Sequence, residues 1–179
     1  MNPNKYQELA MRTSNKELDK GEHVINGALG LCGEAGELMR AVRAKYSAGY
    51  VDNVLDEAGD VCWYLAELCT ALGVHLGEVF PSESSVRVEL SEIEAADAIA
   101  MLAAKIADAV KKAYMQGHHF DRAYIKEQME GIAYGIVVIA AHEHVHVPKI
   151  MERNIEKLKK RFPDGFSAER SINREAGDI

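Results

Sequence analysis

Two pairs of acidic residues have the spacing that metal binding or catalysis requires. Glu34 and Glu37 form the first pair, in GEAGE, and Glu57 and Asp60 form the second, in DEAGD. Residues three positions apart share one face of a helix, with Cβ atoms about 5–6 Å apart. A turn is expected near 47–52, so the helices that carry the two pairs should be antiparallel neighbours. Four carboxylates are therefore predicted to converge.

These carboxylates remain ionised at close range only if a cation neutralises them. Oxygen ligands favour hard ions, so Mg²⁺ is the expected cofactor, with Mn²⁺ as its substitute. A di-iron site in a helical bundle would carry histidine where this chain has Glu37 and Asp60. One acid pair of this kind is usually a solvated helix face. Two pairs that flank one turn favour a metal site, and Mg²⁺ in proteins commonly binds substrate phosphates.

The elements that must position these acids are predicted to be helices. Apolar residues recur at the helical spacing i, i+3, i+4 and i+7, and no segment sustains the alternation of a strand. The fold class is therefore all-α, a helical bundle built from antiparallel helix hairpins. Helices are expected over 4–13, 22–46, 51–72, 91–116, 121–142 and 148–161, followed by an irregular tail over 162–179.

The second half of the chain resembles the first. AVRAKY at 41–46 is similar to AVKKAY at 109–114, and DEAGDVCWY at 56–64 is similar to KEQMEGIAY at 126–134. The matches keep their order along the chain, and tyrosines align in both. We interpret this as a degenerate internal duplication, in which each helical hairpin covers the apolar face of the other.

The duplication suggests how one domain, 1–179, is organised. The segment 22–80 is the predicted catalytic hairpin, and 91–151 is a degenerate repeat or an insertion. Only the second acid pair has acidic counterparts in this repeat, Glu127 and Glu130. One active site per chain is therefore expected, with the second hairpin as a scaffold.

Composition limits the classes of partner. The 179-residue chain has a net charge of −7, which argues against a broad nucleic-acid surface. No apolar run approaches the roughly 18 residues that span a bilayer, and the polar N-terminus does not resemble a signal peptide. The three cysteines, Cys32, Cys62 and Cys69, form no CxxC motif. We expect a cytoplasmic protein with reduced thiols, and no membrane or nucleic-acid partner.

The two acid motifs and their flanks resemble a known family. GEAGELMRAV followed by LDEAGDVCWYLAELC is similar to the all-α nucleoside triphosphate pyrophosphatases, the MazG-like group related to the dimeric dUTPases. The stretches YQELAMRT and NIEKLKKRFPDGFS resemble the ends of single-domain members. The resemblance implies hydrolysis of a (d)NTP to (d)NMP and pyrophosphate, and it suggests a homodimer. It also implies that the catalytic residues and Mg²⁺ ligands are Glu34, Glu37, Glu57 and Asp60.

The resemblance also implies residues that bind the triphosphate. Family members use a basic stretch near the C-terminus for phosphates, which here contains Asn154, Lys157 and Arg161 on one helical face. Lys45 and Arg43, which follow the first acid motif, are further candidates. The alternative for each of the lysines is a solvated helix face.

The base and the attacking water need partners as well. Tyr64 lies one helical turn after Asp60, where the family has an aromatic residue that stacks on the base; packing in the core is the alternative. Gln7 is a candidate for reading a base edge. Many members have an acid before the first motif, where this chain has Gly33. The general base is therefore either Glu34 or a water activated by the metal alone.

Other assignments stay open at this point. The histidines at 142, 144 and 146 offer a second metal site if they lie on a helix, but the repeat places them in a connection. Hydrolysis of another phosphoanhydride, of the phosphoribosyl-ATP type, is an alternative reaction. A non-catalytic nucleotide-binding module is a third alternative. The glycines around the first acid pair, Gly30, Gly33 and Gly36, are expected to let a neighbouring helix or a nucleotide approach closely.

Overall fold

Helices are the only regular secondary structure in the described part of the chain. The computed structural model describes residues 1–48 and 53–173, and no strand occurs among them. Three short 3₁₀ turns lie at Met11–Thr13, Leu76–Glu78 and Glu83–Ser85. The α-helices are α1 (Pro3–Ala10), α2 (Lys20–Ala48), α3 (Val54–Leu72), α4 (Glu92–Gln116), α5 (Arg122–His142), α6 (Val147–Arg161) and α7 (Ala168–Ile172).

Local capping explains where the long helices begin and end. Ser91 caps α4, since its side chain accepts from the Glu94 backbone N–H while the Glu94 carboxylate accepts from the Ser91 backbone. The same helix ends at Gly117, whose φ of 73° is left-handed and favours glycine. Gly73 ends α3 in the same way, with φ 65°. These stop signals fix the lengths of the helices that form the bundle.

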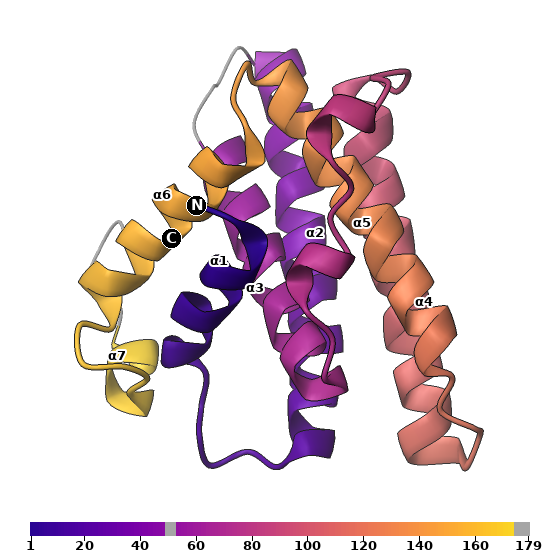
Figure 1. Cartoon of the computed structure of the whole chain (residues 1–179), viewed down its shortest axis with the longest axis vertical. Helices are drawn as coiled ribbons and strands as arrows, with labels where there is room; N and C mark the ends of the chain where they lie inside the picture. The colour runs from indigo at the N-terminus through magenta and orange to yellow at the C-terminus, as the bar shows by residue number, and fades with distance from the viewer. Residues whose placement is uncertain (49–52, 174–179) are drawn as a thin grey trace.

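Four long helices form the bundle, and two others cover one side of it (Figure 1). Helix α3 runs antiparallel to α2, and the 73–91 connection returns the chain to the other end of the bundle. Helix α4 then packs antiparallel to α2, and α5 packs against both α4 and α3. Helices α1 and α6 contact each other and α3. Helix α3 therefore lies between the second hairpin and the α1/α6 pair.

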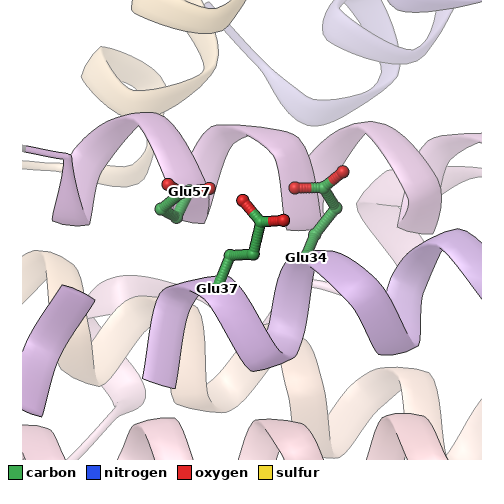
Figure 2. Close-up of side chains that lie close together, drawn as sticks. All are labelled: Glu34, Glu37 and Glu57. Atoms are coloured by element: carbon green, nitrogen blue, oxygen red, sulfur yellow. The ribbon is translucent and has the colours of Figure 1, made fainter. Parts of the chain in front are cut away.

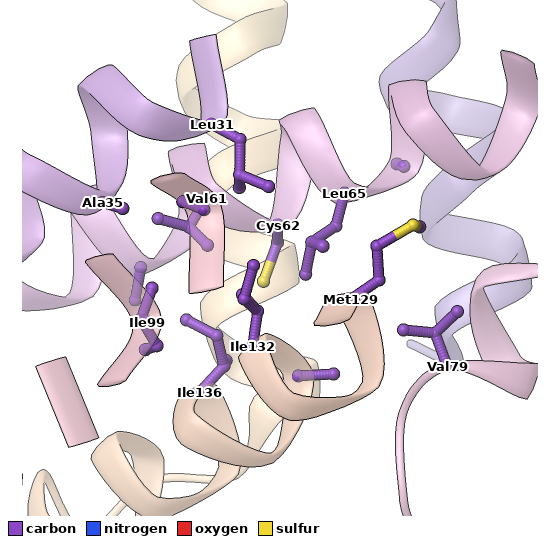
Figure 3. Packing of buried hydrophobic residues seen from close by; sticks show 14 of the residues in the cluster. Leu31, Ala35, Val61, Cys62, Leu65, Val79, Ile99, Met129, Ile132 and Ile136 are labelled. Carbon is purple, nitrogen blue, oxygen red and sulfur yellow. The ribbon is translucent and has the colours of Figure 1, made fainter. Parts of the chain in front are cut away.

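A single apolar core joins the two hairpins (Figure 3). Leu31 from α2, Leu65 from α3, Ile99 from α4 and Ile132 from α5 are all fully buried in it. Truncating one such side chain to alanine costs about 2–5 kcal/mol of folding free energy. Because this core fixes α2 against α3, the functional side chains on these two helices are held in a defined register.

The predicted all-α fold is confirmed, with differences at the helix ends. The helix expected over 4–13 is α-helical to Ala10 and continues as a 3₁₀ turn. The helix expected over 51–72 begins at Val54 among the described residues; 51 and 52 lie outside them. The tail over 162–179 was expected to be irregular, yet it contains α7, capped by Ser167. No described helix combines the length and apolarity needed to cross a bilayer.

The second hairpin carries packing contacts at the positions that correspond to the acid motifs. Leu102 is the counterpart of Glu34, and its Cδ1 lies against α5, only 2.7 Å from where a Cβ on Gly131 would be. Glu130 is the counterpart of Asp60 and forms an ion pair with Lys126 at 2.5 Å. These contacts suit the scaffold role expected for 91–151, and the internal duplication itself stays a prediction.

Candidate functional site

Three of the four predicted carboxylates come together between α2 and α3. Glu34 and Glu37 extend from α2 toward Glu57 on α3 (Figure 2). One carboxylate oxygen from each residue lies within 4.8 Å of the others, which is close enough for all three to hold one cation. The three ligands are all oxygen atoms, so the donor set suits Mg²⁺ or Mn²⁺.

The electrostatics of this cluster favour a cation. Burial, followed by the nearby Asp60, Glu37 and Glu57, raises the pKa of Glu34 to about 7. Burial, followed by Glu37 and Asp60, raises the pKa of Glu57 to about 7 as well. The ionised form of both carboxylates is therefore destabilised at neutral pH, because each side chain lacks full hydration and lies near other negative charges. A bound divalent cation would offset this destabilisation by neutralising the negative charges.

Asp60, the fourth predicted ligand, lines the same cavity but is not one of the three residues whose oxygens lie within 4.8 Å of one another. Its Oδ1 accepts from Asn154 Nδ2 at 2.8 Å, and its Oδ2 accepts from Lys157 Nζ at 2.6 Å. Burial raises the pKa of Asp60, and the charge of Lys157 opposes that rise. Three carboxylates thus meet the distance for one shared cation, while Asp60 lines the same cavity with both of its oxygens engaged by donors on α6; its role as a metal ligand stays a prediction.

Asn154 is itself fixed by a buried contact behind the site. Tyr6 is fully buried, and its hydroxyl donates to Asn154 Oδ1 at 2.7 Å. Helix α6 approaches α3 closely here: a Cβ added at Gly59 would lie only 2.9 Å from the Asn154 Cβ. The absence of a side chain at Gly59 makes this approach possible. Asn154 therefore positions Asp60, whereas its place on the basic helical face had predicted a contact with phosphates.

The three carboxylates line a cavity of about 610 Å³. The lining includes the carboxylates of both motifs and two basic residues from α6, Lys157 and Arg161. Aromatic and amide side chains line it as well. These further lining residues are Thr13, Asn15, Leu18, Asn26, Trp63, Tyr64, Leu158, Phe162, Phe166 and Ser171. One cavity thus offers acidic, basic and aromatic groups together.

Tyr64 lines this cavity, as the stacking assignment required, and its ring packs against α2. A Cβ on Gly30 would overlap Tyr64 Cε1, so only glycine leaves room for the ring. Trp63 meets Tyr64 edge to face, with ring centroids 4.8 Å apart. The indole Nε1 of Trp63 donates to Thr13 Oγ1 at 3.0 Å. Two aromatic rings are therefore held in place beside the acid cluster.

Lys45 and Gln7, two predicted substrate-binding residues, do not line this cavity. Lys45 Nζ forms an ion pair with Glu92 at 2.8 Å and another with Glu143, at the far end of α2. Gln7 donates to Thr70 Oγ1 and the Val74 carbonyl, and its Oε1 accepts from the Leu76 backbone. Both side chains join helices and connections, so the structure gives neither one a role beside the acids.

The histidines at 142 and 146, an alternative metal site, do not come together. His142 ends α5, and its Nε2 lies 3.0 Å from the Leu90 carbonyl. His146 caps α6, and its Nδ1 lies 2.6 Å from Glu83 Oε2. The two rings sit on separate elements with separate partners, which agrees with the expected connection.

Several residues that line the cavity were not among the site residues expected from the sequence. Asn26 is four residues before Gly30 and eight before Glu34, so it shares their helix face; that spacing was a usable signal. Phe162 and Phe166 come from the segment after α6, whose fold the periodicity did not indicate. Gly33 is exposed, and a Cβ there would meet no atom within 4 Å.

Comparisons with known proteins identify no relative. Models of protein families, curated proteins and solved structures were all compared with this chain, and none matches. No family is assigned.

Proposed function

We propose that this chain is a Mg²⁺-dependent nucleoside triphosphate pyrophosphohydrolase, which converts a (d)NTP to (d)NMP and pyrophosphate. The observation that carries the proposal is one cavity that combines three clustered carboxylates, two basic residues and two fixed aromatic rings. Each group matches one part of a nucleotide. The resemblance of the acid motifs to the MazG-like group supports the same assignment.

The carboxylates that line the cavity suit the reacting phosphates. Glu34, Glu37 and Glu57 would hold the cation, for which their oxygen donors and raised pKa values are fitted. Bound Mg²⁺ supplies charge neutralisation for the triphosphate oxygens and lowers the pKa of a coordinated water. Lys157 and Arg161 line the same cavity and add positive charge where the triphosphate would lie.

The proposed reaction is an attack of water on the α-phosphorus. The new bond joins the water oxygen to that phosphorus, and the bond to the bridging oxygen of the leaving pyrophosphate breaks. Glu34 is our candidate for accepting the water proton, because Gly33 has no side chain to do so.

The aromatic residues that line the cavity suit the nucleoside. The rings of Trp63 and Tyr64 offer flat apolar surface, and stacking of a base on an aromatic side chain contributes about 1–3 kcal/mol. Tyr64 is fixed against Gly30, so this surface is rigid before the nucleotide arrives.

The deciding experiment measures pyrophosphate release from a panel of ribo- and deoxynucleoside triphosphates, with Mg²⁺ and with EDTA. We expect release that requires the metal and is lost in Glu57→Gln. Glu127→Gln is the matched control, since it makes the same change at the exposed counterpart in the second hairpin. Absence of release from every nucleotide, or full activity of Glu57→Gln, would refute the proposal.

A further inference from the structure

The orientation of the Asn26 amide is determined by a buried glutamate. Asn26 Nδ2 donates to Glu67 Oε2 at 2.7 Å, and Glu67 is only 1% exposed. The other oxygen of Glu67 lies 2.9 Å from His23 Nδ1 and accepts from Ser14 Oγ at 3.3 Å. A carboxylate accepts and does not donate, so the Asn26 amide group must turn its nitrogen toward Glu67.

This contact leaves Asn26 Oδ1 as the atom that Asn26 can offer to a ligand. Asn26 is exposed and lines the same cavity as the acid cluster. Within the described part of the chain, no donor is directed at Oδ1. Asn26 therefore presents the cavity with a hydrogen-bond acceptor and keeps its donor group engaged elsewhere.

The position of Asn26 matches the base end of a nucleotide. Asn26, Gly30 and Glu34 follow one another at intervals of four residues along one face of α2. Eight residues of helix span about 12 Å. Between the two ends, the Tyr64 ring lies over Gly30. A nucleoside triphosphate with its phosphates at Glu34 and its sugar and base along Tyr64 would bring the base edge to Asn26.

We propose that Asn26, oriented by Glu67, selects nucleoside triphosphates whose base carries an amino group at C4 of a pyrimidine or C6 of a purine, that is, cytosine or adenine. Cytosine and adenine present an amino donor on the edge where uracil, thymine and guanine present a carbonyl acceptor. The amino group would donate to Asn26 Oδ1, whereas a carbonyl oxygen would face it with like partial charge. This inference rests on the proposed function, because it assigns the base subsite of the same cavity.

The decisive variant is Glu67→Gln, which should reverse the orientation of the Asn26 amide without altering a residue that contacts the substrate. In Glu67→Gln, the side-chain oxygen can keep its contacts with His23 and Ser14, which places the new amide nitrogen opposite Asn26. Asn26 must then turn its own oxygen toward residue 67 and present its nitrogen to the cavity. We expect the ratio of kcat/KM for CTP over UTP, and for ATP over GTP, to fall by about tenfold or to invert. A purely structural role for Glu67 would lower all four values equally.

Two further variants complete the design. Asn26→Ala removes the amide that would contact the base. Because Asn26 is exposed, this variant should fold even if Glu67→Gln does not, and it should lose the preference for CTP over UTP and for ATP over GTP. Glu92→Gln is the matched control, because Glu92 is an equally buried glutamate that does not line the cavity. It should keep the base preference of the unchanged protein. Equal kcat/KM for CTP and UTP in the unchanged protein, or a full preference in Asn26→Ala, would overturn the inference.

Failure of this inference can be told apart from failure of the proposed function. Trp63 is the single tryptophan and lines the cavity, so its fluorescence reports nucleotide binding without turnover. Binding of CTP that is tighter than that of UTP, with no pyrophosphate release, would refute the hydrolase and support the base subsite. Release without a base preference would refute the subsite alone. Absence of both binding and release would overturn both.

Discussion

The ring of Tyr64 on α3 fills the space beside Gly30 on α2 that the side chain of any other residue would need. This contact joins the two helices that carry the acid cluster, at a point between the acids and Asn26. The glycine that weakens α2 locally is thus the residue that allows the aromatic wall of the cavity to form.

Replacing this glycine should therefore destabilise the protein. In Gly30→Ala the new methyl group overlaps the Tyr64 ring, which must move, at a cost of about 1–3 kcal/mol of unfolding free energy. Urea denaturation measures the change. Gly33→Ala is the matched control on the same helix, where a Cβ meets nothing within 4 Å. Alanine there should stabilise by about 0.5–1 kcal/mol, through helix propensity alone. Equal stabilisation by both variants would contradict the contact.

Removing a carboxylate of the cluster should weaken metal binding. Glu37→Gln leaves two ionised oxygen ligands for the cation, so we expect the affinity for Mg²⁺ to fall by more than about tenfold. The increase in melting temperature that Mg²⁺ produces should shrink accordingly. Differential scanning fluorimetry across a Mg²⁺ titration measures both effects. Asp108→Asn removes an exposed acid on α4 and should leave the Mg²⁺ response unchanged.

Metal binding should also depend on pH. The pKa values of Glu34 and Glu57 are raised from 4.5 to about 7. Between these values the folded state holds more protons than the unfolded state, so these two groups make the metal-free protein less stable as pH rises. Protons compete with the cation for the same oxygens. We expect Mg²⁺ to raise the melting temperature more at about pH 8 than at about pH 6. An equal response at both pH values would show that these carboxylates do not bind the metal.

The buried contact behind Asp60 gives a prediction about stability. Tyr6→Phe removes the donor to Asn154 Oδ1 in a fully buried place, which should cost about 1–3 kcal/mol. Tyr134→Phe is the matched control, since the Tyr134 hydroxyl donates to the Arg87 carbonyl in an exposed position. That change should stay within about 0.5 kcal/mol in chemical denaturation. A small effect of Tyr6→Phe would mean that Asn154 does not depend on this hydrogen bond.

Part of the candidate site was predictable because it depends on spacing along helices. Glu34 and Glu37 share a face by their offset, and α3 packs beside α2, so their approach to Glu57 followed from the sequence. Lys45 was assigned to phosphates because it follows the first motif. It is eight residues after Glu37, about 12 Å further along the axis, and the structure places it among Glu92 and Glu143 at the other end of α2.

Asp60 shows what spacing alone did not provide. Its offset from Glu57 places it near the cluster, but the approach of α6 to Gly59 engages it with Asn154 and Lys157. Gln7 shows the same limit, because its partners on α3 and in the connection that follows lie more than sixty positions away. Such contacts depend on how far one helix slides and rotates against another, to within an ångström or two.

The sequence by itself determined the helical class of the protein, most helix bounds and the convergence of Glu34, Glu37 and Glu57, because these features depend on periodicity and on neighbours within a few turns. The tertiary structure alone decided that Tyr64 lies over Gly30, that Asp60 pairs with Lys157, and that Glu67 orients Asn26. The physical reason is that core packing among α2, α3, α4 and α5 sets the offset of each helix, and side-chain contacts follow from that offset.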